Sequence, residues 1–126
     1  MKMNLKLTFA LLAGVALGAL TIGGLNAQSK GPGAYAVVDI AEVTDPEGFK
    51  QLVPIAGPAA ENAGGKYIAR TEKITSLDGT PPKRFVIIAF DNVDKAKAWH
   101  ASADQKKVDA IRSKTTKSRV FVVEGM

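Results

Sequence analysis

The chain has 126 residues, 17 basic and 12 acidic side chains and a formal net charge of +5. That length predicts a single domain, and the lysines are scattered along the chain, which excludes the clustered basic surface of a nucleic-acid-binding protein. With no cysteine and one histidine, the sequence excludes a disulfide scaffold and lacks the several nitrogen or sulfur ligands of a conventional transition-metal site. We therefore expect no nucleic acid, metal or cofactor as a partner.

The N-terminal segment, residues 1–27, has the layout of a secretory signal peptide. Lys2 and Lys6 form a basic start, residues 7–25 carry no charge, and the small residue Ala27 precedes the expected cleavage site. Cleavage predicts a periplasmic or secreted protein with no stable membrane association and a formal charge of +3, since two lysines are removed from +5. The alternative is an uncleaved membrane anchor, because about 17 to 25 apolar residues can span a bilayer.

Residues 28–33 are predicted to be a flexible lead, and residues 34–126 form the domain. The domain opens with a strand at 34–43, rich in β-branched residues. Asp45 and Pro46 then predict a helix start, because aspartate caps free amides and proline suits the first helical position. The apolar stripe of this helix contains two prolines, which predict a kink or break.

A glycine pair at 64–65 ends that helix, with one of the two expected in the left-handed conformation. The remaining predicted elements are a strand at 66–77, a turn at 78–82, a strand at 83–90, a helix capped by Asn92, a second helix capped by Ser102, and a strand at 118–125. This order predicts an α+β fold of the ferredoxin-like βαββαβ kind, with a four-stranded antiparallel sheet and helices on one face.

The strand at 85–90 is apolar on both faces, since it has no polar side chain and successive side chains point to opposite sides. Residues 120–123 show the same feature. Helices can cover only one face of the sheet, and an exposed apolar face usually marks an interface. We therefore predict a homodimer with two sheets packed face to face. The alternative is a monomer whose lead segment or kinked helix folds under the sheet.

Five segments together resemble a known family. They are "AYAVVDIAEVTDPEGF", "AGGKYIAR", "PPKRFVIIAF", "AWHAS" and "VVEG", and their order and spacing are similar to those of domain-of-unknown-function family 1330, within the dimeric α/β-barrel superfamily. The resemblance covers about residues 34–125 and implies a ferredoxin-like subunit and a face-to-face homodimer, but no activity. The family tends to have glycines where this chain has Thr71 and Glu72, and an aromatic residue where Gln105 stands.

Asp39 is a candidate functional residue because its carboxylate lies in the middle of an apolar strand. A carboxylate in such a place needs a partner or stays protonated. It either contributes to a binding cleft or forms a structural ion pair with Arg70, Arg84 or Arg119.

His100 follows the helical arc of Val93, Ala96 and Trp99, so we expect it to face inward. It is either a hydrogen-bonded core residue or a proton-exchanging group. Trp99 forms either the core or a pocket wall. Arg112 either reaches back toward the cleft or caps its helix at the surface.

These residues support two hypotheses for function. The first is a binding module that holds a small anionic or aromatic molecule in a cleft between helices and sheet. Asp39, Arg70, Trp99 and His100 are expected to converge on this cleft, and Arg70 or Arg112 is expected to contact the ligand. The second is an enzyme similar to the superfamily's cofactor-independent monooxygenases, with Asp39 and His100 handling protons. A purely structural or auxiliary homodimer is a further alternative. Haem is not expected, because Asp109 occupies the place of the ligating histidine of the haem-degrading relatives.

Overall fold

The structure is a computed structural model that describes residues 33–126. The predicted signal peptide and lead residues 28–32 lie outside the described residues. The elements, in chain order, are β1 (Ala34–Val43), α3 (Pro46–Phe49), the short 3₁₀ helix η2 (Lys50–Leu52), α4 (Val53–Asn62), β2 (Lys66–Thr71), β3 (Arg84–Phe90), α5 (Val93–Ala101), α6 (Ala103–Thr115) and β4 (Thr116–Glu124).

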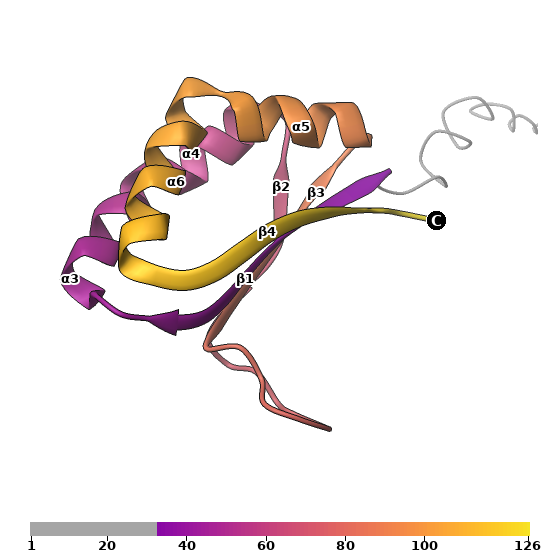
Figure 1. Cartoon of the computed structure of the whole chain (residues 1–126). Helices are drawn as coiled ribbons and strands as arrows, with labels where there is room; N and C mark the ends of the chain where they lie inside the picture. The colour runs from indigo at the N-terminus through magenta and orange to yellow at the C-terminus, as the bar shows by residue number, and fades with distance from the viewer. Residues whose placement is uncertain (1–32) are drawn as a thin grey trace, which may run out of the picture. The chain divides into compact units, whose positions relative to one another are not determined.

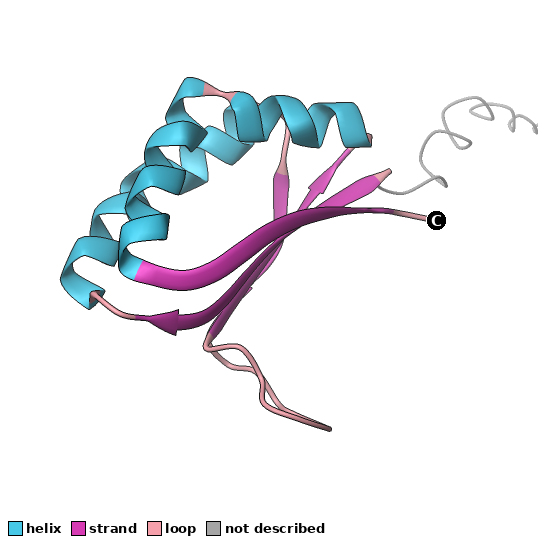
Figure 2. Ribbon diagram, viewed as in Figure 1, coloured by secondary structure: helices cyan, strands magenta, loops and turns pink. Residues whose placement is uncertain are grey.

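The four strands form one sheet in the order β2-β3-β1-β4, and every neighbouring pair is antiparallel. The helices all lie on one side of this sheet (Figures 1 and 2). This arrangement confirms the predicted α+β, ferredoxin-like βαββαβ fold.

The predicted helix caps are present. Asp45 accepts a hydrogen bond from the amide of Gly48, Asn92 from that of Lys95, and Ser102 from that of Gln105. Each cap satisfies an amide that the first helical turn leaves free.

The first helical region is broken, as its prolines predict. Pro54 has no N–H to donate to the carbonyl of Lys50, so the chain passes through the tighter η2 between α3 and α4. Gly64 ends α4 with a φ of 87°, a conformation that glycine adopts at little cost.

Strand β2 is shorter than predicted, because it ends at Thr71 instead of continuing to residue 77. Thr71 pairs with Phe85 in the last rung of the β2–β3 ladder. Pro81 and Pro82 have no N–H to continue that ladder. Residues 72–83 therefore form a long loop, which projects away from the helices (Figure 1).

The core lies between the sheet and the helices. Its largest fully buried side chains are Trp99, Phe90 and Ile88. The backbone of Gly65 passes so close to this core that an added Cβ would lie 2.8 Å from both Ile88 and Phe90. The core therefore requires glycine at this position. None of the helices in residues 33–126 combines the length and the apolar character needed to cross a membrane.

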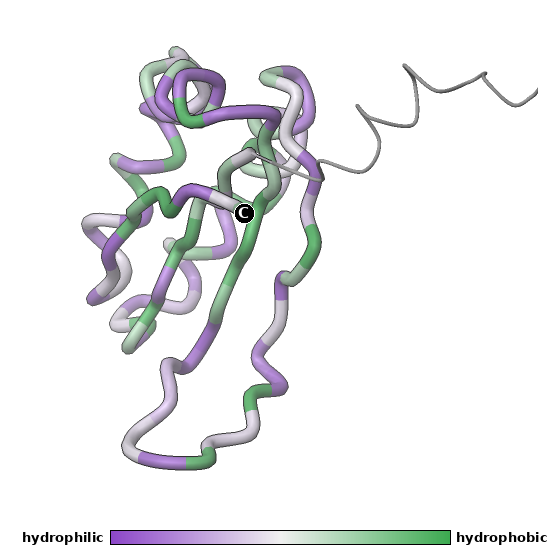
Figure 3. The backbone as a smooth tube through the Cα atoms, turned by 90° about the vertical axis from the view of Figure 1, so that its right-hand side faces the viewer, coloured by the Kyte–Doolittle hydropathy of each residue, from purple (hydrophilic) through white to green (hydrophobic). Residues whose placement is uncertain are grey.

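The face of the sheet turned away from the helices is also apolar. Figure 3 shows continuous hydrophobic character along β3, whereas polar and apolar residues are mixed along β2. Residues that alternate with the core positions occupy this second face, which we call the free face; they are Tyr35, Val37, Asp39, Phe85, Ile87, Ala89, Arg119, Phe121 and Val123. Phe121 and Val123 are 40% and 44% exposed in the single chain.

Candidate functional site

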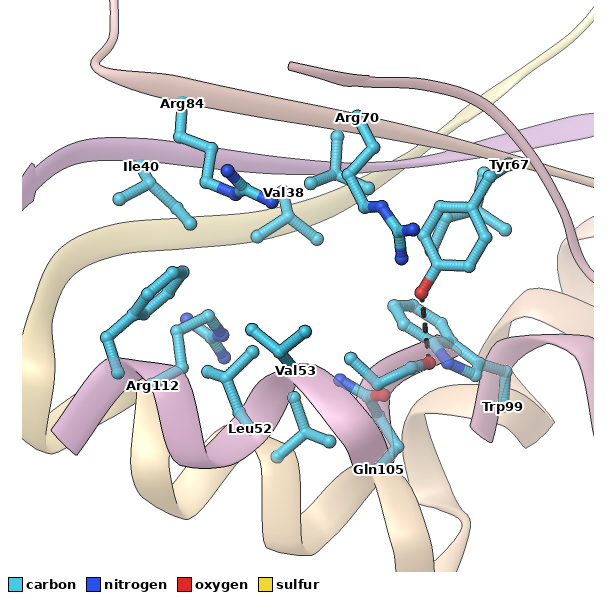
Figure 4. A pocket seen from close by; sticks show the side chains of 15 residues that line it. Val38, Ile40, Leu52, Val53, Tyr67, Arg70, Arg84, Trp99, Gln105 and Arg112 are labelled. Atoms are coloured by element: carbon cyan, nitrogen blue, oxygen red, sulfur yellow. Dashed lines mark hydrogen bonds between the residues drawn. The ribbon is translucent and has the colours of Figure 1, made fainter. Parts of the chain in front are cut away.

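A cavity of about 150 Å³ lies between the sheet and the helices. Figure 4 shows strands along one side and helices along the other. Its apolar wall includes Val38, Ile40, Leu52, Val86 and Val108. Its polar residues are Tyr67 and Arg70 from β2, Arg84 from β3, and Gln105 and Arg112 from α6, and Trp99 of α5 closes one end.

A β-bulge places Tyr67 and Arg70 on the same face of β2. Tyr67 is opposite Ile88 and Arg70 is opposite Val86, and the register shifts between Tyr67 and Ala69. Without that extra residue, positions three apart would lie on opposite faces of the strand. The guanidinium of Arg70 stacks over the Tyr67 ring, with its Cζ 4.7 Å from the ring centroid.

Arg70 is the cation of the cavity that lacks a counter-charge. No carboxylate in residues 33–126 lies within ion-pair distance of it. Arg84, by contrast, is paired with Glu72 at 3.0 Å, and Arg112 with Asp109 at 2.8 Å. The cavity lining itself contains no aspartate or glutamate. The site therefore favours a negative charge next to Arg70.

Two buried N–H groups of lining residues have no hydrogen-bond acceptor in the described part of the chain. They are Nε1 of Trp99 and Nε of Arg112. Trp99 is only 2% exposed and packs against Phe90, with the ring centroids 5.6 Å apart. A buried donor without an acceptor costs about 1 to 3 kcal/mol. Both atoms belong to residues that line the cavity, but neither atom is itself accessible from it.

Tyr67 is held as a neutral phenol at the cavity wall. Its hydroxyl donates a hydrogen bond of 2.9 Å to the backbone carbonyl of Ala56 on α4. Burial raises the pKa of Tyr67, although the nearby Arg70 guanidinium opposes that shift. The hydrogen bond links β2 to α4 across the cavity (Figure 4).

Asp109 joins the cavity to the protein surface. Its Oδ1 accepts hydrogen bonds from Gln105 Nε2 at 3.1 Å and Arg112 Nη2 at 2.8 Å. Its Oδ2 lies 3.1 Å from Nε2 of His100. Ser118 also accepts a hydrogen bond from Arg112, so the two contacts hold the Arg112 side chain in one orientation. This side chain is only 13% exposed.

The prediction that His100 faces inward is wrong. Its side chain is 52% exposed and does not line the cavity. The buried stripe of α5 contains Ala96 and Trp99, and the next residue lies about 100° further around the helix. There His100 contacts Asp109 of α6 and borders a separate hollow beside residues 120–122 of β4. Arg112 lines the cavity. This is the first of the two positions predicted for it, the other being a cap at the surface end of its helix.

Asp39 is also separated from the cavity. It lies on the free face, opposite Arg119 in the β1–β4 ladder, and accepts a hydrogen bond of 3.0 Å from Arg119 Nε. The structure therefore shows the ion-pair alternative and contradicts a shared cleft. Of the predicted site residues, Arg70, Trp99 and Arg112 line the cavity, whereas Asp39 and His100 do not.

Three polar lining residues were not among the predicted site residues: Tyr67, Arg84 and Gln105. Helical spacing gave a usable signal for Gln105, since positions 105, 108 and 112 fall on one face of α6. Strand alternation gave no signal that Tyr67 joins Arg70, because it places them on opposite faces. Residues 33–126 contain no group of three histidine, aspartate or glutamate residues that could hold a metal ion.

Fold and cavity together define a ferredoxin-like α+β protein with a small, cation-bordered apolar pocket. The chain belongs to the family described as Domain of unknown function (DUF1330), whose model matches residues 33–126. The match confirms the family resemblance found in the sequence. No curated protein matches the chain significantly.

Several solved structures share this fold. A protein of unknown function from Rhodopseudomonas palustris aligns with a TM-score of 0.61 at 13% identity, covering 82% of this chain and 92% of that one. SnoaB, a cofactor-independent oxygenase from Streptomyces nogalater, aligns with a TM-score of 0.53 at 12% identity, covering 75% and 94%. A dimeric ferredoxin-like protein of unknown function from Thermobifida fusca gives 0.52 at 14% identity, covering 76% and 93%. At these identities the likeness extends to the fold alone.

Proposed function

We propose that the protein binds a small organic molecule in the cavity between the helices and the sheet. The observation that carries this proposal is the combination of a largely apolar cavity with an arginine at its border, Arg70, that has no carboxylate partner in residues 33–126. Binding sites for small molecules combine a largely apolar wall with a few such polar groups. Arg70 itself is exposed at the rim, so its guanidinium is available to a ligand that enters the cavity.

Mass spectrometry of material purified from the native compartment tests the proposal. Wild-type protein should retain a small molecule, and Ala56→Leu, which fills the cavity wall, should lose it. Ala98→Leu adds the same side chain at an exposed position of α5 outside the cavity and should retain the molecule. Equal retention by the two variants, or no retained molecule in the wild type, would contradict the proposal.

A monooxygenase-like enzyme is the alternative function. Its support is the shared fold with a cofactor-independent oxygenase. The two residues expected to move protons, Asp39 and His100, lie outside the cavity, which is why we place binding first. Turnover of an oxidisable phenol or quinol that Ala56→Leu abolishes and Ala98→Leu preserves would favour the enzyme.

We further propose that the protein is a homodimer in which the free faces of two sheets pack together. The exposed apolar side chains Phe121 and Val123 support this arrangement, because a second copy would remove them from water. The Thermobifida fusca protein with the same fold is described as dimeric. Without catalysis or a ligand, such a dimer would be purely structural or auxiliary.

Export to the periplasm or medium is also proposed, with cleavage after Ala27. It rests on the basic start, the uncharged run and the small residue at the site. Amino-terminal sequencing of protein from the exporting host should begin at Gln28. An intact Met1 in a membrane fraction would favour the uncleaved anchor instead.

A further inference from the structure

The size of the cavity limits its occupant. Its volume is about 150 Å³. An apolar protein cavity of about the same volume, ~150 Å³, takes up one benzene molecule. Larger ligands require pockets of about 300 Å³ or more. A nucleotide or a fused polycyclic molecule would therefore extend beyond the cavity, whereas a single six-membered ring fits within it.

The charge of the cavity limits its occupant further. Arg84 and Arg112 each have a carboxylate partner, which leaves the guanidinium of Arg70 as the unmatched charge among the lining residues. One free guanidinium balances one negative charge. A singly charged carboxylate fits this better than a phosphate monoester, which carries close to two charges at neutral pH.

The position of Arg70 separates the polar end of the cavity from its apolar part. Figure 4 shows its guanidinium directed toward the end where Tyr67 and Trp99 lie, whereas Val38 and Leu52 border the middle. The Tyr67 ring supports the guanidinium by stacking. Trp99, at the same end, contributes the face of its ring to the wall.

We propose that the cavity takes a single-ring organic acid of the benzoate class. Its carboxylate pairs with Arg70 at the Tyr67–Trp99 end, and its ring lies against Val38, Leu52 and Val108. This inference rests on the proposed binding function and adds the chemical class of the ligand. It also assigns Arg70 as the residue that selects for charge.

Fluorescence of Trp99 offers a direct test, because it is the only tryptophan of the chain and lines the cavity. The exported protein is titrated with benzoate and with benzamide, which has nearly the same shape but no charge. Benzoate should bind at least about tenfold more tightly, as expected for a charge-assisted pair with guanidinium. Arg70→Gln should remove that preference, because it should weaken benzoate binding much more than benzamide binding.

Lys66→Gln is the matched control, since it removes one positive charge from an exposed position of the same strand outside the cavity. It should keep the preference for benzoate. Equal binding of benzoate and benzamide by the wild type would overturn the inference and leave small-molecule binding intact. The inference would also be overturned if the preference survived Arg70→Gln or if neither compound bound. In either case, the proposed binding function would still be supported if the wild type retained a molecule and Ala56→Leu abolished that retention.

Discussion

Both faces of the sheet are largely apolar, but they differ in whether their polar groups are paired with each other. On the face covered by helices, Arg70 and the buried N–H groups of Trp99 and Arg112 border a cavity without complete partners. On the free face, Asp39 and Arg119 pair with each other across neighbouring strands. The covered face therefore carries the proposed ligand site, whereas the polar groups of the free face pair with each other, as the proposed dimer interface requires.

Adjacent substitutions in β3 should separate the two faces most strongly. Val86 lies in the core and Ile87 on the free face. Val86→Asp should destabilise folding by about 2 to 4 kcal/mol, because it removes a buried apolar side chain and desolvates a carboxylate, a cost that Arg70 on the facing strand offsets only in part. Ile87→Asp should leave a folded chain that no longer dimerises. Circular dichroism and light scattering measure the two effects.

The reverse result, an unfolded Ile87→Asp variant and a folded Val86→Asp variant, would contradict the assignment of faces. A wild-type protein that remains monomeric at micromolar concentration would contradict the proposed dimer.

A pair of glycine variants should sharpen the description of the covered face. Gly65→Ala should cost about 2 kcal/mol, because its Cβ would lie 2.8 Å from Ile88 and from Phe90 in a closely packed core. Gly64→Ala has no atom within 4 Å of the added Cβ and should cost about 1 kcal/mol through its positive φ alone. Urea unfolding compares the two, and equal costs would mean that the core yields easily near Gly65.

Removal of one partner of the free-face ion pair should have a smaller effect. Arg119→Ala leaves the Asp39 carboxylate, whose side chain is only 18% exposed, without its partner. We expect a cost of about 1 kcal/mol in urea unfolding. The double variant Asp39→Ala/Arg119→Ala should recover part of that loss, and no recovery would indicate that Arg119 acts through packing on Phe121 instead.

The smallest expected effect is a change in pH dependence at Tyr67. Burial raises its pKa in the folded protein above the ordinary value of 10.0. The folded state therefore holds the phenolic proton more tightly than the unfolded state, so the resulting stability is complete below pH 10 and declines as pH rises through the folded pKa. The wild type should lose more stability than Tyr67→Phe between about pH 9 and 11. Parallel losses in urea unfolding would contradict the assigned shift.

Most of the fold follows from local sequence features. Caps at Asp45, Asn92 and Ser102 mark the helix starts, and Pro54 accounts for the break within the first helical region. These signals depend on neighbouring residues, so they can be found without knowledge of the packing. The cavity was only partly predictable: Arg70 and Trp99 were found as polar or large side chains on otherwise apolar segments, and Tyr67, Arg84 and Gln105 were not.

The sequence by itself determined the helices and strands, their order and the apolar character of both faces of β3. These features depend on residue type and on the fixed repeat of side-chain direction along a helix or strand. The tertiary structure decided which polar groups meet. Only the bulge after Tyr67 brings its ring under Arg70, and only the strand register places Asp39 beside Arg119. Likewise, the packing of α6 against α5 gives His100 a partner in Asp109 outside the cavity. Such pairings depend on segments far apart in the chain, and a shift of one residue in a strand reverses the face of every side chain that follows.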